Sequence, residues 1–140
     1  MASFFSHLEC SVPCGAGPYD PRQIHHLCTC GAPLLARYDL TAAKQLSKSS
    51  FAGREGSMWR YSELMPLLNT SGQGGERESP VSLGEGWTPL IRTPRLGKAL
   101  GLEQLYVKDE SLNPTNSFKA RGLSAAVTRA FYLGAKVLSI

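Results

Sequence analysis

The sequence predicts an α/β fold preceded by a small cysteine-rich module. Apolar runs at 105–108 and 136–140 are typical of strands, and a helical pattern extends between them from 117 to about 133. A strand, a helix and a strand over this length form a crossover unit, which implies a parallel sheet. All four cysteines, in contrast, lie within residues 1–30. The two parts of the chain therefore differ in architecture.

Composition excludes several classes of protein. The chain has 140 residues, of which 42% are hydrophobic, enough for one ordinary domain or a small module plus part of a larger one. No stretch approaches the length of a membrane span. Residues 1–8 lack the basic region and long apolar run of a signal peptide. We therefore expect a cytoplasmic protein with no membrane partner. In such a protein cysteines are expected to be metal ligands or free thiols rather than to form disulfides.

The formal charge of +4 raises the question of an anionic partner. The basic residues are scattered from Arg22 to Lys136, with acidic residues between them and no run of five. This pattern indicates a solvated, mildly basic surface. We expect no nucleic-acid partner.

The cysteines form two pairs. Three residues separate Cys10 from Cys14, one separates Cys28 from Cys30, and thirteen lie between the pairs. Two such knuckles can present four thiolates to a zinc ion, as in a zinc ribbon. The alternatives are two reduced buried pairs or a site that has lost its metal. We predict a zinc-ribbon-like module over 1–40 with a structural zinc site.

Two further features belong to this module. His25 and His26 precede the second pair, but four cysteines already complete a closed site, so we expect the histidines to lie in an exposed loop. Residues 33–40 alternate well enough to predict a strand that returns from the second pair. Forty residues cannot bury an adequate core without such a metal.

A connecting segment is predicted over 41–80. It begins with a short helix at 41–48, capped by Thr41. The run 58–68 predicts a helical turn that packs three side chains on a core: Trp59, Tyr61 and Leu64. Residues 69–80 are polar and glycine-rich, which indicates a linker or surface loop.

The α/β part of the chain is predicted over 81–140. A short helix is expected at 96–100, a buried strand at 105–108 and a left-handed C-cap at Gly134. Because a parallel sheet needs helices on both faces, the two strands of this part do not make a complete sheet. We therefore expect this part to be truncated.

The loop before the last predicted helix places a lysine in a reactive position. Pro114 disfavours helical backbone at Asn113, so the helix begins later, with Asn116 or Ser117 as cap. Lys119 then lies near the positive end of the helix dipole, which disfavours a second positive charge. A neutral lysine amine attacks carbonyl groups and can form a Schiff base. The alternative is a solvated lysine on an amphipathic helix.

This loop resembles the lysine motif of pyridoxal-phosphate enzymes with the tryptophan-synthase-β fold (fold type II). Their pattern is close to Asn-Pro-Thr-Gly-Ser-Phe-Lys-Asp-Arg-Gly. The matching residues are Asn113, Pro114, Thr115, Ser117, Phe118, Lys119, Arg121 and Gly122. Asn116 replaces the glycine, and asparagine tolerates positive φ better than most residues. Ala120 replaces the aspartate and removes a carboxylate beside the lysine.

Within that group the chain is most similar to the threonine synthase family. Three features carry this likeness: the cysteine pairs followed by 34–40, the Trp-Arg-Tyr run at 59–61, and the Leu-Gly-Glu-Gly-Trp-Thr-Pro-Leu run at 83–90. The resemblance implies threonine biosynthesis, in which a small amino-acid phosphate, O-phosphohomoserine, reacts with water to give threonine and phosphate.

The resemblance also implies roles for single residues. Lys119 would bind pyridoxal 5'-phosphate covalently and then act as the general base. Phe118 would flank the cofactor ring, although a plain core position is the alternative. Ser117 and Asn116 would fix the turn and contact the cofactor. Arg121 would either attract the substrate phosphate or pair with a nearby acid, Asp109 or Glu110.

In this family the cofactor phosphate binds a glycine-rich loop that follows the next strand. Since the sequence ends in that strand, we expect an N-terminal piece of a longer enzyme, inactive alone and homodimeric when complete. Two alternatives stay open. One is a threonine or serine dehydratase, or a cysteate synthase, of the same fold. The other is a zinc-ribbon binding module without catalysis.

Overall fold

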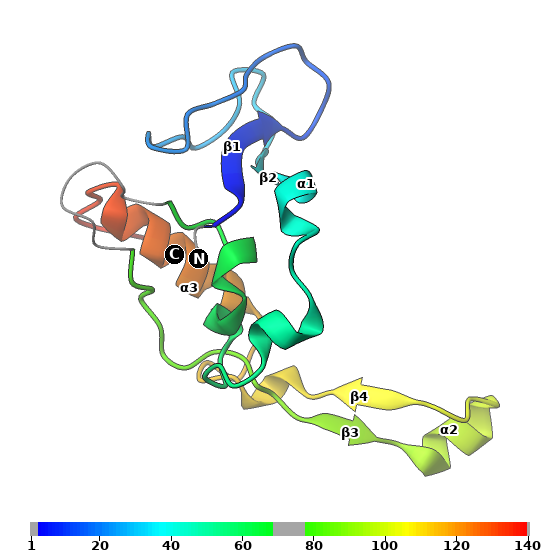
Figure 1. Ribbon diagram of the computed structural model, residues 1–140. Coiled ribbons are helices and arrows are strands. Elements are labelled where there is room, and N and C mark those ends of the chain that lie inside the picture. The colour runs from blue at the N-terminus through cyan, green and yellow to red at the C-terminus, as the bar shows by residue number, and fades with distance from the viewer. Residues whose placement is uncertain (1–2, 69–77, 140) are drawn as a thin grey trace.

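The computed structural model describes residues 3–68 and 78–139. Two small antiparallel sheets and a long C-terminal helix dominate the described chain (Figure 1). The architecture is therefore mixed α/β. Within the described residues, every helix is too short or too polar to cross a membrane. The predicted linker at 69–80 lies mostly outside the described residues.

The first sheet organises the cysteine module. β1 (Phe5–Cys10) pairs with β2 (Leu34–Tyr38), with Cys10 opposite Leu34 and a register irregularity between Phe5 and His7. β2 confirms the strand predicted at 33–40. β1 was not predicted, because the side chains of this segment do not alternate cleanly between apolar and polar.

The connecting segment is less helical than predicted. α1 (Leu40–Ala43) spans four residues, and its cap is Asp39, whose carboxylate accepts the Ala42 N–H at 2.9 Å. The predictions of a Thr41 cap and of a helix as far as 48 were wrong. Serine side chains divert the chain at this point, since Ser47 and Ser50 exchange hydrogen bonds around a separate 3-10 turn, η1 (Lys48–Phe51).

The central core is small and apolar. It consists of Met58, Trp59 and Leu67, with Met65 and Ala125 packed against them. The 3-10 helix η2 (Met58–Leu64) supplies the first two of these residues.

Of the aromatic face predicted for η2, only Trp59 is buried. Tyr61 is 45% exposed and Leu64 41%. A 3-10 helix has three residues per turn, and this one is kinked at Tyr61, so the α-helical spacing of the prediction does not apply. Tyr61 instead packs edge-on against Phe51, with 4.9 Å between ring centroids.

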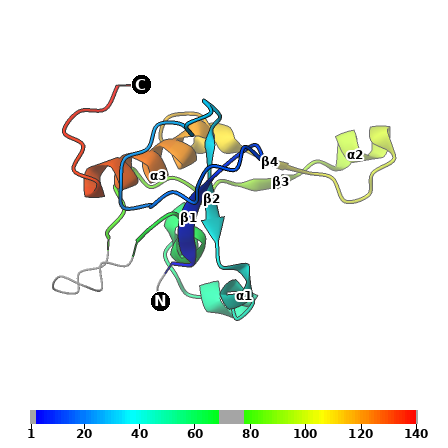
Figure 2. The same ribbon diagram turned by 90° about the horizontal axis from the view of Figure 1, so that it is seen from above.

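The second sheet is a hairpin with a helix at its tip. β3 (Leu90–Arg92) and β4 (Tyr106–Lys108) pair antiparallel, and α2 (Pro94–Leu100) connects them. In both overall views this hairpin projects away from the rest of the chain (Figures 1 and 2). The helix predicted at 96–100 is confirmed, but the strand predicted as buried is exposed.

The C-terminal helix α3 (Lys119–Tyr132) follows a short 3-10 turn, η3 (Glu110–Leu112). Gly134 adopts φ 78° just beyond it, as predicted for a left-handed cap. Residues 136–139 are not a strand, so the predicted parallel crossover is wrong for the described chain. Among the described residues β4 pairs with antiparallel β3, and residues 136–139 pair with neither strand of this sheet.

Candidate functional site

The lysine loop follows η3 and leads into α3. Asn113 is 2% exposed, and its carbonyl accepts the Asn116 N–H at 2.8 Å, which closes a turn. Asn116 has φ 53°, in the left-handed region. The expectation that asparagine can replace the usual glycine here is thus confirmed, because this backbone conformation is one that asparagine tolerates.

Ser117 stabilises the first turn of α3 through its side chain. Its hydroxyl accepts the backbone N–H of Lys119 at 3.2 Å. Asn116 and Ser117 were the two residues expected to cap the helix. Ser117 provides the hydrogen-bond acceptor for the first turn, but the N-cap position itself is occupied by Phe118. The lysine consequently begins the helix, as the proline and serine spacing predicted.

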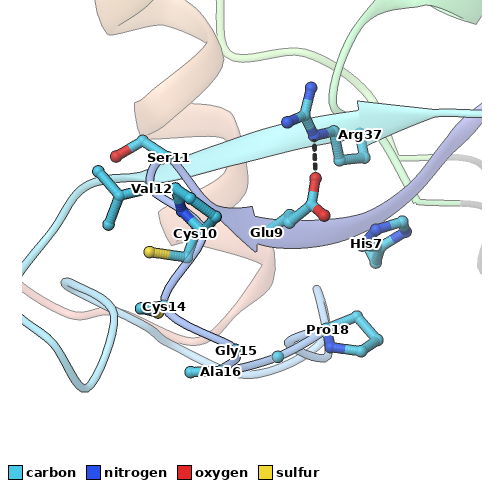
Figure 3. Close-up of a pocket in the computed structure, with 12 residues that line it drawn as sticks. His7, Glu9, Cys10, Ser11, Val12, Cys14, Gly15, Ala16, Pro18 and Arg37 are labelled. Carbon is cyan, nitrogen blue, oxygen red and sulfur yellow. Dashed lines mark hydrogen bonds and ion pairs between the residues drawn. The ribbon is translucent and has the colours of Figure 1, made fainter.

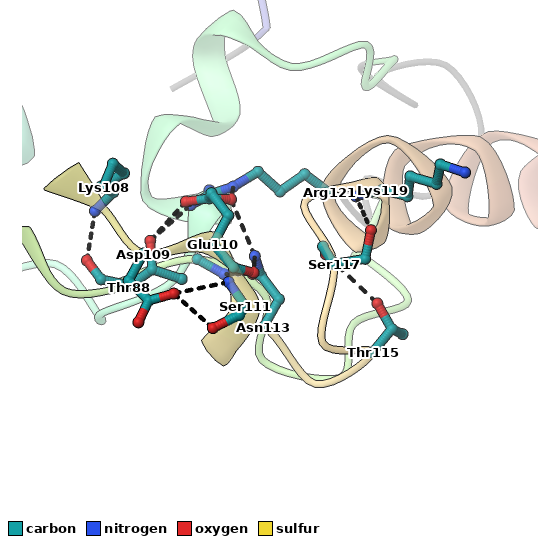
Figure 4. Close-up of polar contacts among 11 residues, drawn as sticks. Thr88, Lys108, Asp109, Glu110, Ser111, Asn113, Thr115, Ser117, Lys119 and Arg121 are labelled. Atoms are coloured by element: carbon teal, nitrogen blue, oxygen red, sulfur yellow. Dashed lines mark hydrogen bonds and ion pairs between the residues drawn. The ribbon is translucent and has the colours of Figure 1, made fainter.

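Lys119 itself is exposed. Figure 4 shows its side chain extending along α3, away from the polar cluster beside the loop. Phe118, also predicted to contact the cofactor, is 65% exposed, which rules out the alternative of a core position in the described chain. Asn116 is exposed and Ser117 half-buried. The cofactor roles of these four consecutive residues stay predictions.

The polar cluster centres on Glu110. Its carboxylate accepts two hydrogen bonds from Arg121, at 2.7 and 2.8 Å, one from the Thr88 hydroxyl at 2.6 Å and one from the Asn113 side-chain amide at 3.0 Å (Figure 4). The Arg121 guanidinium, then the Thr88 hydroxyl, hold the pKa of Glu110 well below its usual range. Arg121 thus pairs with an acid, as one of its two readings predicted.

The cluster joins the lysine loop to the loop before β3. The Gly86 N–H donates to the Asn113 side-chain oxygen at 3.1 Å, and the Lys108 ammonium donates to the Thr88 carbonyl. These contacts of Thr88 and of the Asn113 side chain were not predicted. Sequence alone offered only a weak signal, a Thr-Pro pair and an acid-x-x-Asn spacing that are common in loops.

The four cysteines converge at the other end of the molecule. Their sulfur atoms all lie within 4.8 Å of one another. Cys10 and Cys28 are buried, and Cys14 and Cys30 are exposed. Cys10 is the last residue of β1, and Figure 3 shows Cys14 beside it at the edge of a cleft of about 700 Å³ that also contains the Glu9–Arg37 ion pair.

Glycines shape the two knuckles. Gly15 and Gly31 have φ values of 78° and 85°, so the chain can turn sharply after each pair. The Gly31 N–H donates to the Cys28 carbonyl at 2.8 Å. His25 lies outside the cluster, bonded through its ring to the Asp20 carbonyl at 3.0 Å. The histidines are therefore not among the grouped ligands, as expected.

The thiols differ in acidity. A backbone hydrogen bond with Cys30 and the Tyr19 hydroxyl lower the pKa of Cys28 to about 6. A backbone hydrogen bond with Val12 lowers the pKa of Cys10. Burial and the neighbouring cysteine side chains outweigh it and raise that pKa to about 12. Metal binding requires deprotonated thiols, and a bound cation would offset the repulsion among four thiolates this close together.

Residues 81–138, which include the hairpin, the lysine loop and α3, match the protein family described as pyridoxal-phosphate dependent enzyme. This part of the chain is thus similar to the class of enzyme predicted from the lysine motif.

The particular resemblance is to threonine synthases. The threonine synthase of Methanocaldococcus jannaschii is 42% identical over 132 residues, which cover 94% of this chain and 31% of that protein. The threonine synthase of Methanosarcina acetivorans is 38% identical over 129 residues, 91% of this chain and 29% of that protein. These relatives confirm the predicted resemblance. The chain spans about a third of their length. No solved structure matches.

Proposed function

We propose that the protein carrying this chain is a threonine synthase, a pyridoxal-phosphate-dependent lyase that converts O-phosphohomoserine and water to threonine and phosphate. One observation carries the proposal. The match to the Methanocaldococcus jannaschii threonine synthase leaves only about 6% of the chain uncovered. It therefore extends from the cysteine module through Lys119, whereas the lysine motif alone is shared by enzymes with other reactions.

Lys119 is the residue we propose to hold the cofactor. Lys119 is the first residue of α3, and its side chain is exposed. The ring of the preceding residue, Phe118, is also exposed, so a primary amine and an aromatic face are both accessible. These residues fit a carbonyl cofactor with a planar ring. When bound, pyridoxal phosphate supplies an electron sink for the reacting carbon. The Lys119 amine then accepts and returns protons as the general base.

The residues before Lys119 support this role through the backbone. Asn116, at φ 53°, reverses the chain, and the Ser117 hydroxyl accepts the Lys119 N–H. Together they set the direction in which the lysine leaves the helix. Their direct contact with the cofactor, a cytoplasmic location and a homodimer of the complete protein stay predictions.

For the cysteine module we propose a structural zinc site. Support comes from the four sulfur atoms within 4.8 Å of one another, contributed by the end of β1 and by two glycine-containing knuckles. A site with four protein ligands leaves no position for a reacting water, so the ion would stabilise the module and take no part in the reaction.

The test uses the protein that carries this chain. After incubation with pyridoxal phosphate and reduction with borohydride, we expect the cofactor on the Lys119 peptide, and none on that peptide in a K119A variant. The exposed Lys136 provides a matched control, since K136A should label normally. Phosphate release from O-phosphohomoserine should depend on Lys119. Keto-acid formation from threonine or serine without that release would favour the dehydratase instead.

A second outcome would reject both enzymes. If zinc binds stoichiometrically but Lys119 is not labelled and no substrate is turned over, the chain is a binding module. The match of residues 81–138 to the pyridoxal-phosphate family argues against that result.

A further inference from the structure

Glu110 connects three segments that meet at the lysine loop. Its carboxylate accepts hydrogen bonds from Thr88 in the loop before β3, from Asn113 in the lysine loop and from Arg121 in the first turn of α3. The donor–acceptor distances range from 2.6 to 3.0 Å. We call these four residues the Glu110 cluster. A single carboxylate thus holds the backbone on both sides of Lys119.

Two residues of the cluster are buried and two are partly exposed. Thr88 is 6% exposed and Asn113 is 2% exposed, while the side chains of Glu110 and Arg121 are 25% and 33% exposed. Two parallel hydrogen bonds join the guanidinium to the carboxylate, which fixes the orientation of both groups. The arrangement is therefore more rigid than an ordinary surface ion pair.

The cluster lies on the other side of the helix from the lysine amine. Lys119 and Arg121 are two positions apart, which places their side chains on different faces of α3. Figure 4 shows the Lys119 side chain directed away from Glu110. Any influence of Glu110 on the lysine must therefore act through the backbone of the first helical turn.

We infer that Glu110 is a positioning residue for Lys119. This inference rests on the proposed cofactor role of that lysine. Through Arg121, Glu110 fixes the first turn of α3, and through Asn113 and Thr88 it fixes the loop that leads into that turn. A lysine so anchored meets the cofactor carbonyl in one orientation, and small misplacements of a reacting group lower rates steeply.

The test compares two ion pairs on the same helix. E110Q removes the charge that holds the first turn of α3. E78Q removes the partner of Arg129, a pair with an N–O distance of 2.8 Å located ten residues beyond Lys119 on α3. Both substitutions leave a guanidinium without its carboxylate. Only the first lies beside the lysine loop, so E78Q controls for a general loss of stability.

The first measurement is made on the protein that carries this chain: the labelling of Lys119 by pyridoxal phosphate and borohydride, relative to the exposed Lys98 and Lys136. We expect E110Q to lower the relative labelling of Lys119 by roughly tenfold or more, and E78Q to leave it unchanged. T88V should lower it by roughly threefold, and T88S, which keeps the hydroxyl, should restore it. Equal effects of E110Q and E78Q would overturn the inference.

The second measurement is backbone amide exchange over 113–119, which needs no cofactor. Faster exchange in E110Q and T88V, but not in E78Q or T88S, supports the positioning role. Unchanged exchange in E110Q overturns it. The two measurements separate the proposals. Absence of preferential Lys119 labelling in the unsubstituted protein that carries this chain would reject the cofactor role, whereas the exchange result decides whether Glu110 orders the loop.

Discussion

Arg129 on α3 donates a hydrogen bond of 2.6 Å to the backbone carbonyl of Pro21, 108 residues earlier in the chain. The same guanidinium pairs with Glu78 at 2.8 Å, and the side chains of Arg129 and Glu78 are only 12% and 4% exposed. Glu78 also accepts the Leu68 N–H at 2.8 Å. One arginine therefore attaches the cysteine module and the end of the connecting segment to the helix that begins with Lys119.

We expect R129M to separate these parts. The substitution keeps most of the apolar stem but leaves the buried Glu78 carboxylate without its cation, which should lower the free energy of unfolding by about 3 kcal/mol. Chemical denaturation measures that loss, and limited proteolysis should show faster cleavage near Pro21. The double variant R129M/E78Q should recover part of the loss. A double variant no more stable than R129M would contradict the explanation.

A second buried ion pair predicts acid sensitivity. Arg54 holds the Glu63 carboxylate through two hydrogen bonds of 2.7 Å, and this pairing lowers the pKa of Glu63 to about 2. Because the folded-state pKa is below the unfolded value of 4.5, the pair stabilises the fold above that value. The contribution should disappear as the pH falls from about 4.5 to 2.

The measurement is the unfolding free energy between pH 7 and pH 2. E63Q should lower it by roughly 3 kcal/mol at pH 7, since Glu63 is 1% exposed and Arg54 27%. It should also flatten the acid limb of the profile, although Glu110, whose pKa is also lowered, maintains part of the slope. An E63Q profile parallel to that of the unsubstituted chain would contradict this assignment.

Loss of one cysteine should empty the proposed metal site. Cys28 is 4% exposed, and its sulfur atom lies 3.5 Å from the sulfur atom of Cys14. We expect the chain to retain about one zinc ion after dialysis, C28S to retain almost none, and the module to lose its folded signal because metal binding drives the folding of such small units. H26A, which alters an exposed residue, is the control and should keep the metal.

Two glycines distinguish backbone strain from steric overlap. Gly84 and Gly86 both have positive φ, 91° and 101°, but a Cβ on Gly86 would lie 2.5 Å from the Met58 nitrogen, whereas a Cβ on Gly84 meets nothing within 4 Å. G84A should therefore lower the unfolding free energy by roughly 1–2 kcal/mol, from strain alone. G86A should lower it by a further 1–3 kcal/mol. Equal losses in thermal or chemical denaturation would reject the predicted overlap.

The lysine loop was predictable because its signals are local. Pro114 restricts the residue before it, Asn116 tolerates the left-handed backbone and the Ser117 hydroxyl accepts the first N–H of the helix, so adjacent residues determine the turn. The cysteine cluster was predictable for a similar reason, since its knuckle spacing points to one site. Strand Leu34–Tyr38 followed from alternation.

Other features depend on distant partners and were missed. Thr88 lies 22 positions before Glu110 and Asn113 three positions after it. The order of residues does not show that both bind the same carboxylate. The strand predicted at 136–140 is absent over the described residues 136–139, because a run of apolar residues does not show whether a parallel partner strand is present for it to pair with. Burial of 105–108 was inferred from apolar residues alone, yet the hairpin leaves that strand exposed.

The projecting hairpin has a consequence for handling the protein. Leu90, Ile91, Tyr106 and Val107 are 43–62% exposed, and within the described chain β3 and β4 pair only with each other. Each strand therefore presents an outer edge of backbone donors and acceptors that can template pairing with a strand of another molecule. At high concentration this hairpin is where aggregation should begin. Conditions that keep the 140-residue chain in solution must therefore protect this edge.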